Sequence, residues 1–136
     1  MVPYLTGLLY TVVPAVAGYA LGLFLMRPAW RSVKEQPDLK GMALILAVLP
    51  MTGVIFGNVA ARLASMENAA PGLEWRLILL GGAWAAIAIA QGAIVGRGFA
   101  AVAKDRAAFG RLLVRSMLPE TAGLVAFAWF ILGWSA

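Results

Sequence analysis

Four long apolar stretches dominate this sequence, at residues 3–26, 42–64, 77–97 and 112–134. Each has about the 20 residues that a helix needs to cross the hydrocarbon core of a bilayer. Membrane-spanning β-strands are much shorter and alternate in polarity, so helices are the expected form. Because 62% of the 136 residues are hydrophobic, a soluble domain of this size has too small an interior to bury them. We therefore predict an all-α membrane protein with four transmembrane helices, a single membrane domain over residues 1–136.

The polar connections between these stretches carry unequal numbers of basic residues. Connections 27–41 and 97–111 hold four Lys or Arg residues each, whereas the connection at 65–76 holds only Arg76. With four helices, the first and third connections lie on the same side of the membrane, and basic loops favour the cytoplasmic side. We expect loops 27–41 and 97–111 in the cytoplasm and both termini outside a multi-pass cell-membrane protein. We expect no cleaved signal peptide, because the first apolar run is too long and lacks a basic start.

Missing residue types exclude several classes of site. The chain has no cysteine and no histidine, which removes thiolate metal sites and the commonest catalytic base. Neither basic connection contains a glycine-rich phosphate loop, and no nucleophile lies near a base. The net charge of +5 gathers at the ends of the apolar stretches, where it indicates topology rather than nucleic-acid binding. We expect no catalytic residue, no cofactor and no nucleic-acid partner.

The two halves of the chain resemble each other. A shift of 69 residues aligns Leu49-Pro50-Met51-Thr52 with Leu118-Pro119-Glu120-Thr121. We predict an internal repeat over residues 11–64 and 80–133, made of two tandem helical hairpins with the same orientation.

One carboxylate, that of Glu120, lies well inside the fourth apolar stretch. A charged side chain at the centre of a membrane helix costs roughly 2.5–3.5 kcal/mol or more, so such residues usually face a protein interior or a cavity. A binding site for a proton or a cation is the main interpretation. A neutral, hydrogen-bonded structural acid is the alternative.

Polar groups at the same depth are candidates to complete a site with Glu120. Gln91 and Glu120 lie symmetrically about the hairpin tip near Asp105 and Arg106, so the amide can reach the carboxylate if the helix faces match. Gln91 can instead act only as a hydrogen-bonding group between helices. Thr52 offers a hydroxyl, although a threonine in a helix often bonds to its own backbone.

Two prolines and a second threonine are expected to support this site. Pro50 and Pro119 each lack a backbone N–H and therefore free a carbonyl on the preceding turn, near Leu46 in the first case. Carbonyl oxygens, including that of Leu49, are natural ligands for a hard cation. Thr121 follows the carboxylate directly.

Two glycine pairs predict how the helices pack. Gly18 and Gly22 lie in the first stretch, and Gly92 and Gly96 lie in the third. Small residues at four-residue spacing let helix backbones approach closely. We expect the first and third helices to pack tightly together, with the second and fourth helices outside them.

Two further residues in the apolar stretches have simpler interpretations. Arg115 precedes Glu120 by five residues, and we expect its side chain to extend to the cytoplasmic surface, with pairing to an acid as the alternative. Trp84 lies deep in the third stretch, where we expect it to be a packing residue.

At Leu-Pro-Glu-Thr-Ala-Gly-Leu the sequence resembles the duplicated four-helix proteolipid, subunit K or c, of V-type and archaeal-type rotary ATPases. The resemblance covers essentially the whole chain. It implies a homo-oligomeric rotor ring among membrane lipids that carries Na⁺ or H⁺. The implied partners are a stator membrane subunit bearing an arginine and a central-stalk subunit. Carried over by position, Glu120 is the ion carboxylate, Gln91 and Thr52 are side-chain ligands, and Leu49 is a carbonyl ligand.

Two positions depart from the sodium-binding branch of that family. Gly53 stands where that branch typically has glutamine, and Phe56 stands where it often has tyrosine. Na⁺ and H⁺ therefore both remain open. The four candidate oxygens, with room for one water beside Gly53, are just enough for a sodium site, so we slightly favour Na⁺ over H⁺. The alternative function is a small four-helix proton-coupled exporter working as a dimer, although residues 4–26 lack the acid expected there. A structural membrane-assembly subunit is a third reading.

Overall fold

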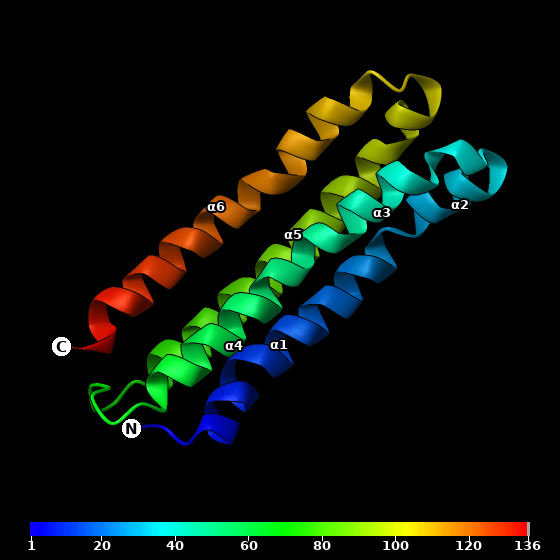
Figure 1. Ribbon diagram of the computed structural model, residues 1–136. Coiled ribbons are helices and arrows are strands. Elements are labelled where there is room, and N and C mark those ends of the chain that lie inside the picture. Colours follow the sequence, from blue (N-terminus) through cyan, green and yellow to red (C-terminus); the bar gives the residue numbers. More distant parts are fainter. Residues whose placement is uncertain (136) are drawn as a thin grey trace.

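The computed structural model describes residues 1–135, which form four roughly antiparallel helical columns (Figure 1). Among these described residues, four helical segments are long and apolar enough to cross a membrane, and the second of them is the continuous run Pro37–Ala64. This confirms the predicted fold class. The elements in chain order are α1 (Tyr4–Leu25), α2 (Arg27–Glu35), η1 (Pro37–Leu39), α3 (Lys40–Val48), η2 (Leu49–Met51), α4 (Thr52–Ala64), α5 (Glu74–Lys104) and α6 (Ala108–Trp134).

The connections at the α2 end are more helical than the sequence predicted. We expected a polar connection over 97–111, but α5 continues to Lys104 and α6 begins at Ala108, so the predicted length was wrong. No proline interrupts this region, and basic residues are good helix formers, so both helices extend past their apolar stretches. The first connection is also largely helical, because α2 and η1 lie within 27–41.

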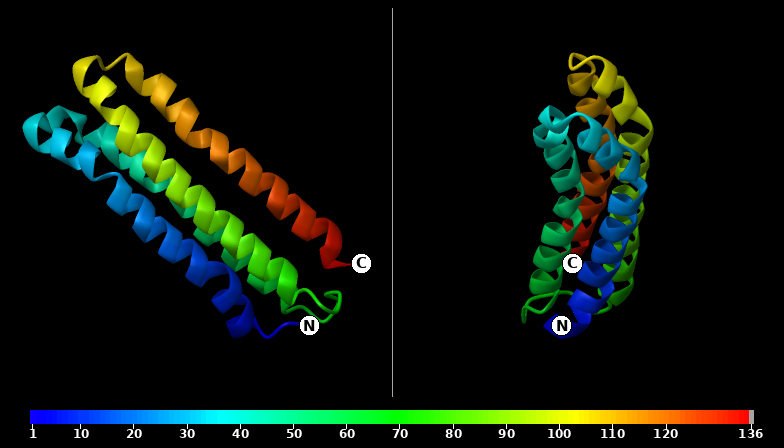
Figure 2. Two further views of the ribbon diagram at one scale, coloured as in Figure 1. Left: turned by 180° about the vertical axis from the view of Figure 1, so that it is seen from behind. Right: turned by 90° about the vertical axis from the view of Figure 1, so that its right-hand side faces the viewer.

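Both described ends of the chain lie at one end of the bundle, and both basic connections lie at the other (Figures 1 and 2). Arg106 joins the two connections. Its guanidinium donates hydrogen bonds to the Asp38 carboxylate and the Gln36 amide oxygen, each at 2.7 Å, and to the Ala103 carbonyl at 2.6 Å. Since the ion pair is exposed, it contributes less than about 1 kcal/mol. The arrangement still neutralises Arg106 and ties the two hairpins together.

α1 and α5 approach each other most closely. A side chain at Gly18 would collide with the backbone of Ala85, and one at Gly92 would collide with the backbone of Gly22. Close contact of this kind requires residues without a Cβ. The predicted tight packing of the first and third membrane helices is therefore confirmed. α4 packs against α1 and α5, whereas α6 packs mainly along α5.

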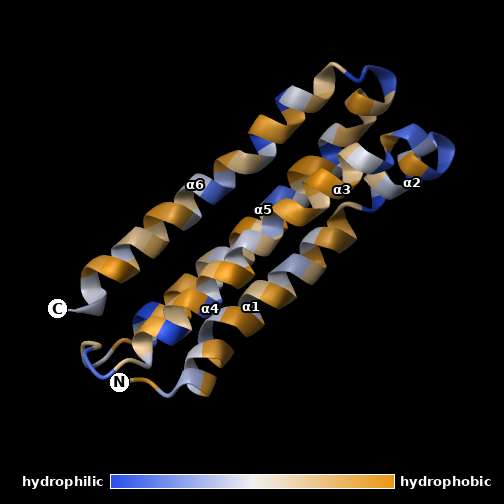
Figure 3. Ribbon diagram, viewed as in Figure 1, coloured by the Kyte–Doolittle hydropathy of each residue, from blue (hydrophilic) through white to orange (hydrophobic). Residues whose placement is uncertain are grey.

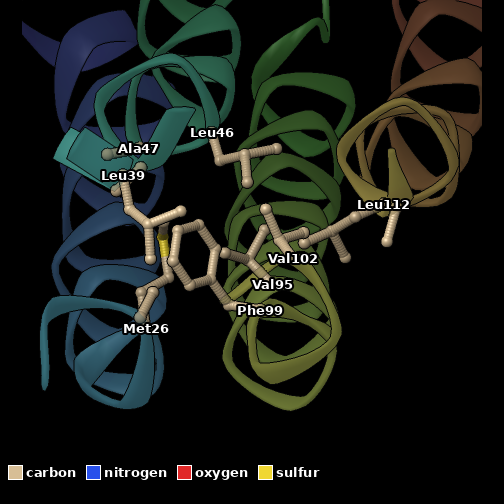
Figure 4. Close-up of a cluster of buried hydrophobic side chains, with 11 residues drawn as sticks. Met26, Leu39, Leu46, Ala47, Val95, Phe99, Val102 and Leu112 are labelled. Atoms are coloured by element: carbon tan, nitrogen blue, oxygen red, sulfur yellow. The ribbon is translucent and has the colours of Figure 1, made fainter. Parts of the chain in front are cut away.

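Two clusters of buried side chains fill the interior. One surrounds Phe99 near the α2 end, where Met26, Leu39 and Val95 contact it (Figure 4). The other surrounds Trp84 in the opposite half of the bundle. Large apolar side chains are exposed on each of the four columns, and hydrophobic residues recur along each ribbon in Figure 3. This outer surface suits contact with lipid or with neighbouring membrane chains.

Candidate functional site

Glu120 lies midway along α6 and is half-buried. It lines a shallow surface groove whose other walls also come from α6, namely Val114, Met117, Leu118, Thr121 and Leu124. Within residues 1–135, no ion pair reaches the carboxylate. Glu120 therefore lies on the outer face of the last helix, among apolar side chains.

The packing of α5 on α6 sets the depth of Gln91. A side chain at Gly98 would meet the side chain of Leu112, which fixes the level of the two helices near the turn. Gln91 precedes Gly98 by seven residues and Pro119 follows Leu112 by seven residues, which is about two helical turns in each case. Gln91 is therefore level with Pro119 and Glu120 along the hairpin. This is the depth that the symmetry of the hairpin predicts.

Gln91 is buried, with 2% of the residue exposed, and its Nε2 has no hydrogen-bond partner in the described part of the chain. The structure therefore places Gln91 at the level of Glu120 without joining the two side chains. Leaving a buried amide donor unpaired costs about 1–3 kcal/mol. Such a group is suited to a partner that arrives from elsewhere, such as a rotated carboxylate or a bound ligand.

Thr52 and Leu49 lie in contact, at the junction of η2 and α4. The Thr52 hydroxyl donates a hydrogen bond to the Leu49 carbonyl at 2.8 Å, and the backbone N–H of Thr52 donates to the same oxygen. The carbonyl is therefore satisfied within its own turn. The two oxygens already lie close enough to ligate the same cation. A cation bound by both would replace the hydrogen bond that the Thr52 hydroxyl donates.

The two prolines affect their helices differently. At Pro50 the helix changes locally to the 3₁₀ segment η2, whereas α6 continues as an α-helix through Pro119. Near Pro50 the Tyr19 hydroxyl donates a hydrogen bond to the carbonyl of Ala47 at 2.9 Å. From the sequence we expected a freed carbonyl near Leu46, and α1 satisfies the neighbouring carbonyl of Ala47 through Tyr19.

Trp84 packs between α4 and α6. A side chain at Gly53 would lie 2.9 Å from its Cβ, and one at Gly123 would lie 2.6 Å from its six-membered ring. The indole also stacks on Phe56, with ring centroids 5.6 Å apart and planes 4° from parallel. The prediction that Trp84 is a packing residue is confirmed, because only 2% of it is exposed.

The indole lies closer to the candidate site than the sequence predicts. Gly53 follows Thr52 directly, and Gly123 lies three residues after Glu120. Trp84 therefore packs against both helices within about one turn of the candidate ligands. A glycine soon after the Leu-Pro-x-Thr pattern in each half was the signal that could have revealed this pocket for a large ring.

Arg115 is exposed and forms no ion pair with any residue in the range 1–135. It lies beside Arg97 and Leu118 on a groove between α5 and α6. Its side chain therefore does not neutralise Glu120. The alternative interpretation from the sequence, in which Arg115 pairs with an acid, is not found among these residues.

No model of a known protein family matches the chain. A curated protein does match it, "A-type ATP synthase subunit K" of Methanocaldococcus jannaschii. The two are 33% identical over 94 residues, which are 68% of this chain and 43% of the relative. The match thus spans less than half the length of that relative. The four apolar helices and this identity agree with the resemblance drawn from the sequence, and the chain belongs to the family of rotary-ATPase proteolipids that includes subunit K of the A-type ATP synthase.

Proposed function

We propose that this protein is an ion-carrying ring subunit of a rotary ATPase or ATP synthase, with Glu120 as the ion carrier. The observation that carries the proposal is the location of this acid, half-buried midway along a membrane-spanning helix. The relation to an A-type ATP synthase subunit K supports it. The chain itself carries ions and performs no chemistry on ATP.

The packing of the helices suits a ring of identical subunits. The close backbone contact of α1 and α5 makes one side of the bundle narrow. α6 lies at its edge, with exposed apolar side chains such as Val125 and Leu132. In a ring, the narrow α1–α5 side faces the centre and α6 faces outward. Neighbouring copies and lipid then cover the apolar surface.

Glu120 must be neutral while it faces lipid, because a bare carboxylate there is too costly. A bound Na⁺ or H⁺ neutralises it during rotation. At the stator, a membrane subunit with an arginine displaces the ion into an aqueous half-channel. The central stalk passes the rotation to the sites where ATP is made or hydrolysed. The ring therefore turns as ions enter and leave Glu120.

The oxygens available to the ion decide which ion is carried. The Glu120 carboxylate, the Gln91 amide, the Thr52 hydroxyl and the Leu49 carbonyl supply about four ligands for Na⁺. The unpaired Gln91 Nε2 is a hydrogen-bond donor, so a Glu120 carboxylate that accepted from it would leave the amide oxygen free to ligate the ion. Thr121, Pro119 and Pro50 act by shaping the backbone around these ligands. Na⁺ is the ion we propose, with H⁺ carried when Na⁺ is scarce.

The basic connections define the orientation in the membrane. Positive residues lie mainly at the end that holds α2 and the α5–α6 turn (Figure 1). We infer that this end is cytoplasmic and that both termini are outside, by the positive-inside rule.

A substitution at Glu120 tests the proposal. Glu120→Gln keeps the volume and hydrogen bonding of the side chain but cannot exchange an ion, so ion transport coupled to ATP hydrolysis should fall to background while assembly persists. Glu74→Gln, the same change at the start of α5, is the matched control and should transport normally. Coupled transport in Glu120→Gln would remove this residue from the mechanism.

The size of the assembly tests the ring separately. In mild detergent, a ring should migrate at many times the 14.4 kDa of one chain. A dimer would instead support the proton-coupled exporter, and a monomer would support neither.

A further inference from the structure

A groove between α5 and α6 near the α2 end has a mixed chemical character. Its walls include the basic residues Arg97 and Arg115 and the apolar residues Ile94, Leu112, Leu118 and Pro119. A second hollow continues it toward the turn and adds Arg111, with Leu112 and Arg115 shared between the two. The result is one continuous depression with guanidinium groups at one end and apolar side chains at the other.

The arginines of this groove are not neutralised by the protein. Within residues 1–135, neither hollow is lined by an acidic side chain, and no ion pair involves Arg97, Arg111 or Arg115. Arg106, only a few residues away, is instead paired with Asp38. Three unpaired cations around one groove favour an anionic ligand.

The depth of the groove matches the boundary of a membrane. A side chain at Gly96 would collide with the backbone of Leu25, the last residue of α1. Arg97 therefore lies where the first membrane helix ends and the basic helix α2 begins. Arg111 and Arg115 are four residues apart on α6, so they lie on the same face of that helix. The apolar walls at Leu118 and Pro119 continue toward the middle of the membrane.

We propose that this groove binds an anionic phospholipid. Its phosphate lies among the guanidinium groups of Arg97, Arg111 and Arg115, since arginine forms paired hydrogen bonds with phosphate oxygens. One acyl chain lies along Ile94, Leu118 and Pro119, one turn or less from Glu120 on α6. This inference stands on the groove alone and does not depend on the ion-carrying function.

Lipid retention by the full-length protein in detergent tests the proposal. The protein is incubated with equal amounts of phosphatidylglycerol and phosphatidylcholine, and native mass spectrometry counts each retained lipid. We expect wild-type protein to keep phosphatidylglycerol at least tenfold more than phosphatidylcholine. Arg97→Gln/Arg115→Gln should reduce this preference to about twofold or less. Lys40→Gln/Lys104→Gln is the control: it removes two positive charges from the same end of the bundle, at residues that do not line the groove. This variant should keep the preference for phosphatidylglycerol.

Three results would overturn the proposal. Unchanged preference in the arginine variant would show that the groove holds no lipid phosphate. Equal loss in the lysine variant would show general charge attraction instead of a site. Displacement of the lipid by inorganic phosphate would identify the ligand as a free anion. Since all variants are measured after their helix content and assembly size are matched to wild type, misfolding cannot imitate the expected result.

Discussion

The indole of Trp84 occupies the space beside the bare Cα of Gly123, so that a Cβ there would lie 2.6 Å from two ring carbons. Gly123 lies three residues, or about one helical turn, beyond Glu120 on α6. The contact therefore sets how closely α6 approaches α5 at the depth of the candidate site. The position of Glu120 depends on a ring packed against a glycine.

Gly123→Ala should push α6 away from Trp84. Because a ring and not a flexible chain end fills the space, we expect overpacking to destabilise the bundle by about 1–3 kcal/mol. Gly110→Ala, on the same helix, is the matched control, since a Cβ at Gly110 has no neighbouring atom within 4 Å. It should be neutral or stabilising by up to about 1 kcal/mol. Thermal unfolding in detergent measures both, and equal effects would contradict the packing at Gly123.

Gly92→Ala should separate α1 from α5. The added methyl group would meet the backbone of Gly22, which cannot move without shifting the whole helix. We expect a loss of at least about 2 kcal/mol and fewer assembled rings. Gly82→Ala on the same helix, with nothing within 4 Å of the new Cβ, should assemble normally. Comparable assembly of the two variants would show that α1 and α5 do not pack as described.

Gln91→Leu separates a structural role from ion binding. Its amide Nε2 is buried and unpaired, so replacing the amide by an apolar group of similar size should leave thermal stability unchanged or slightly raised. If the amide ligates Na⁺, the same variant should lose the stabilisation that Na⁺ gives to wild-type protein. A clear loss of stability without Na⁺ would instead favour the hydrogen-bonding role between helices.

Much of the architecture followed from residue patterns. Apolar length predicted four spans, and the glycine pairs predicted the contact of α1 with α5, because both depend on local composition. The ends of α5 and α6 were misjudged since a helix does not stop where hydrophobicity does, as Lys104 shows. The bond from Tyr19 to Ala47 and the location of Trp84 depend on contacts between distant segments. No spacing along the chain reveals such contacts.

The candidate site is a similar mixture. The depth shared by Gln91 and Glu120 follows from the symmetry of a hairpin, and the sequence predicts it. The bond from the Thr52 hydroxyl to the Leu49 carbonyl is the local backbone bond that the sequence offered as an alternative. The orientation of the Gln91 side chain depends on packing between helices and was accessible only from the folded chain.

Labelling by dicyclohexylcarbodiimide shows whether Glu120 is the carboxylate that carries the ion. The reagent enters membranes and modifies protonated carboxyl groups. Peptide mapping of the protein in its native membrane should find one modified residue, Glu120, with loss of ion transport in proportion to labelling. Na⁺ at neutral pH should slow the reaction. Modification of another carboxylate in place of Glu120, or full transport by protein labelled at Glu120, would exclude Glu120 as the ion carrier.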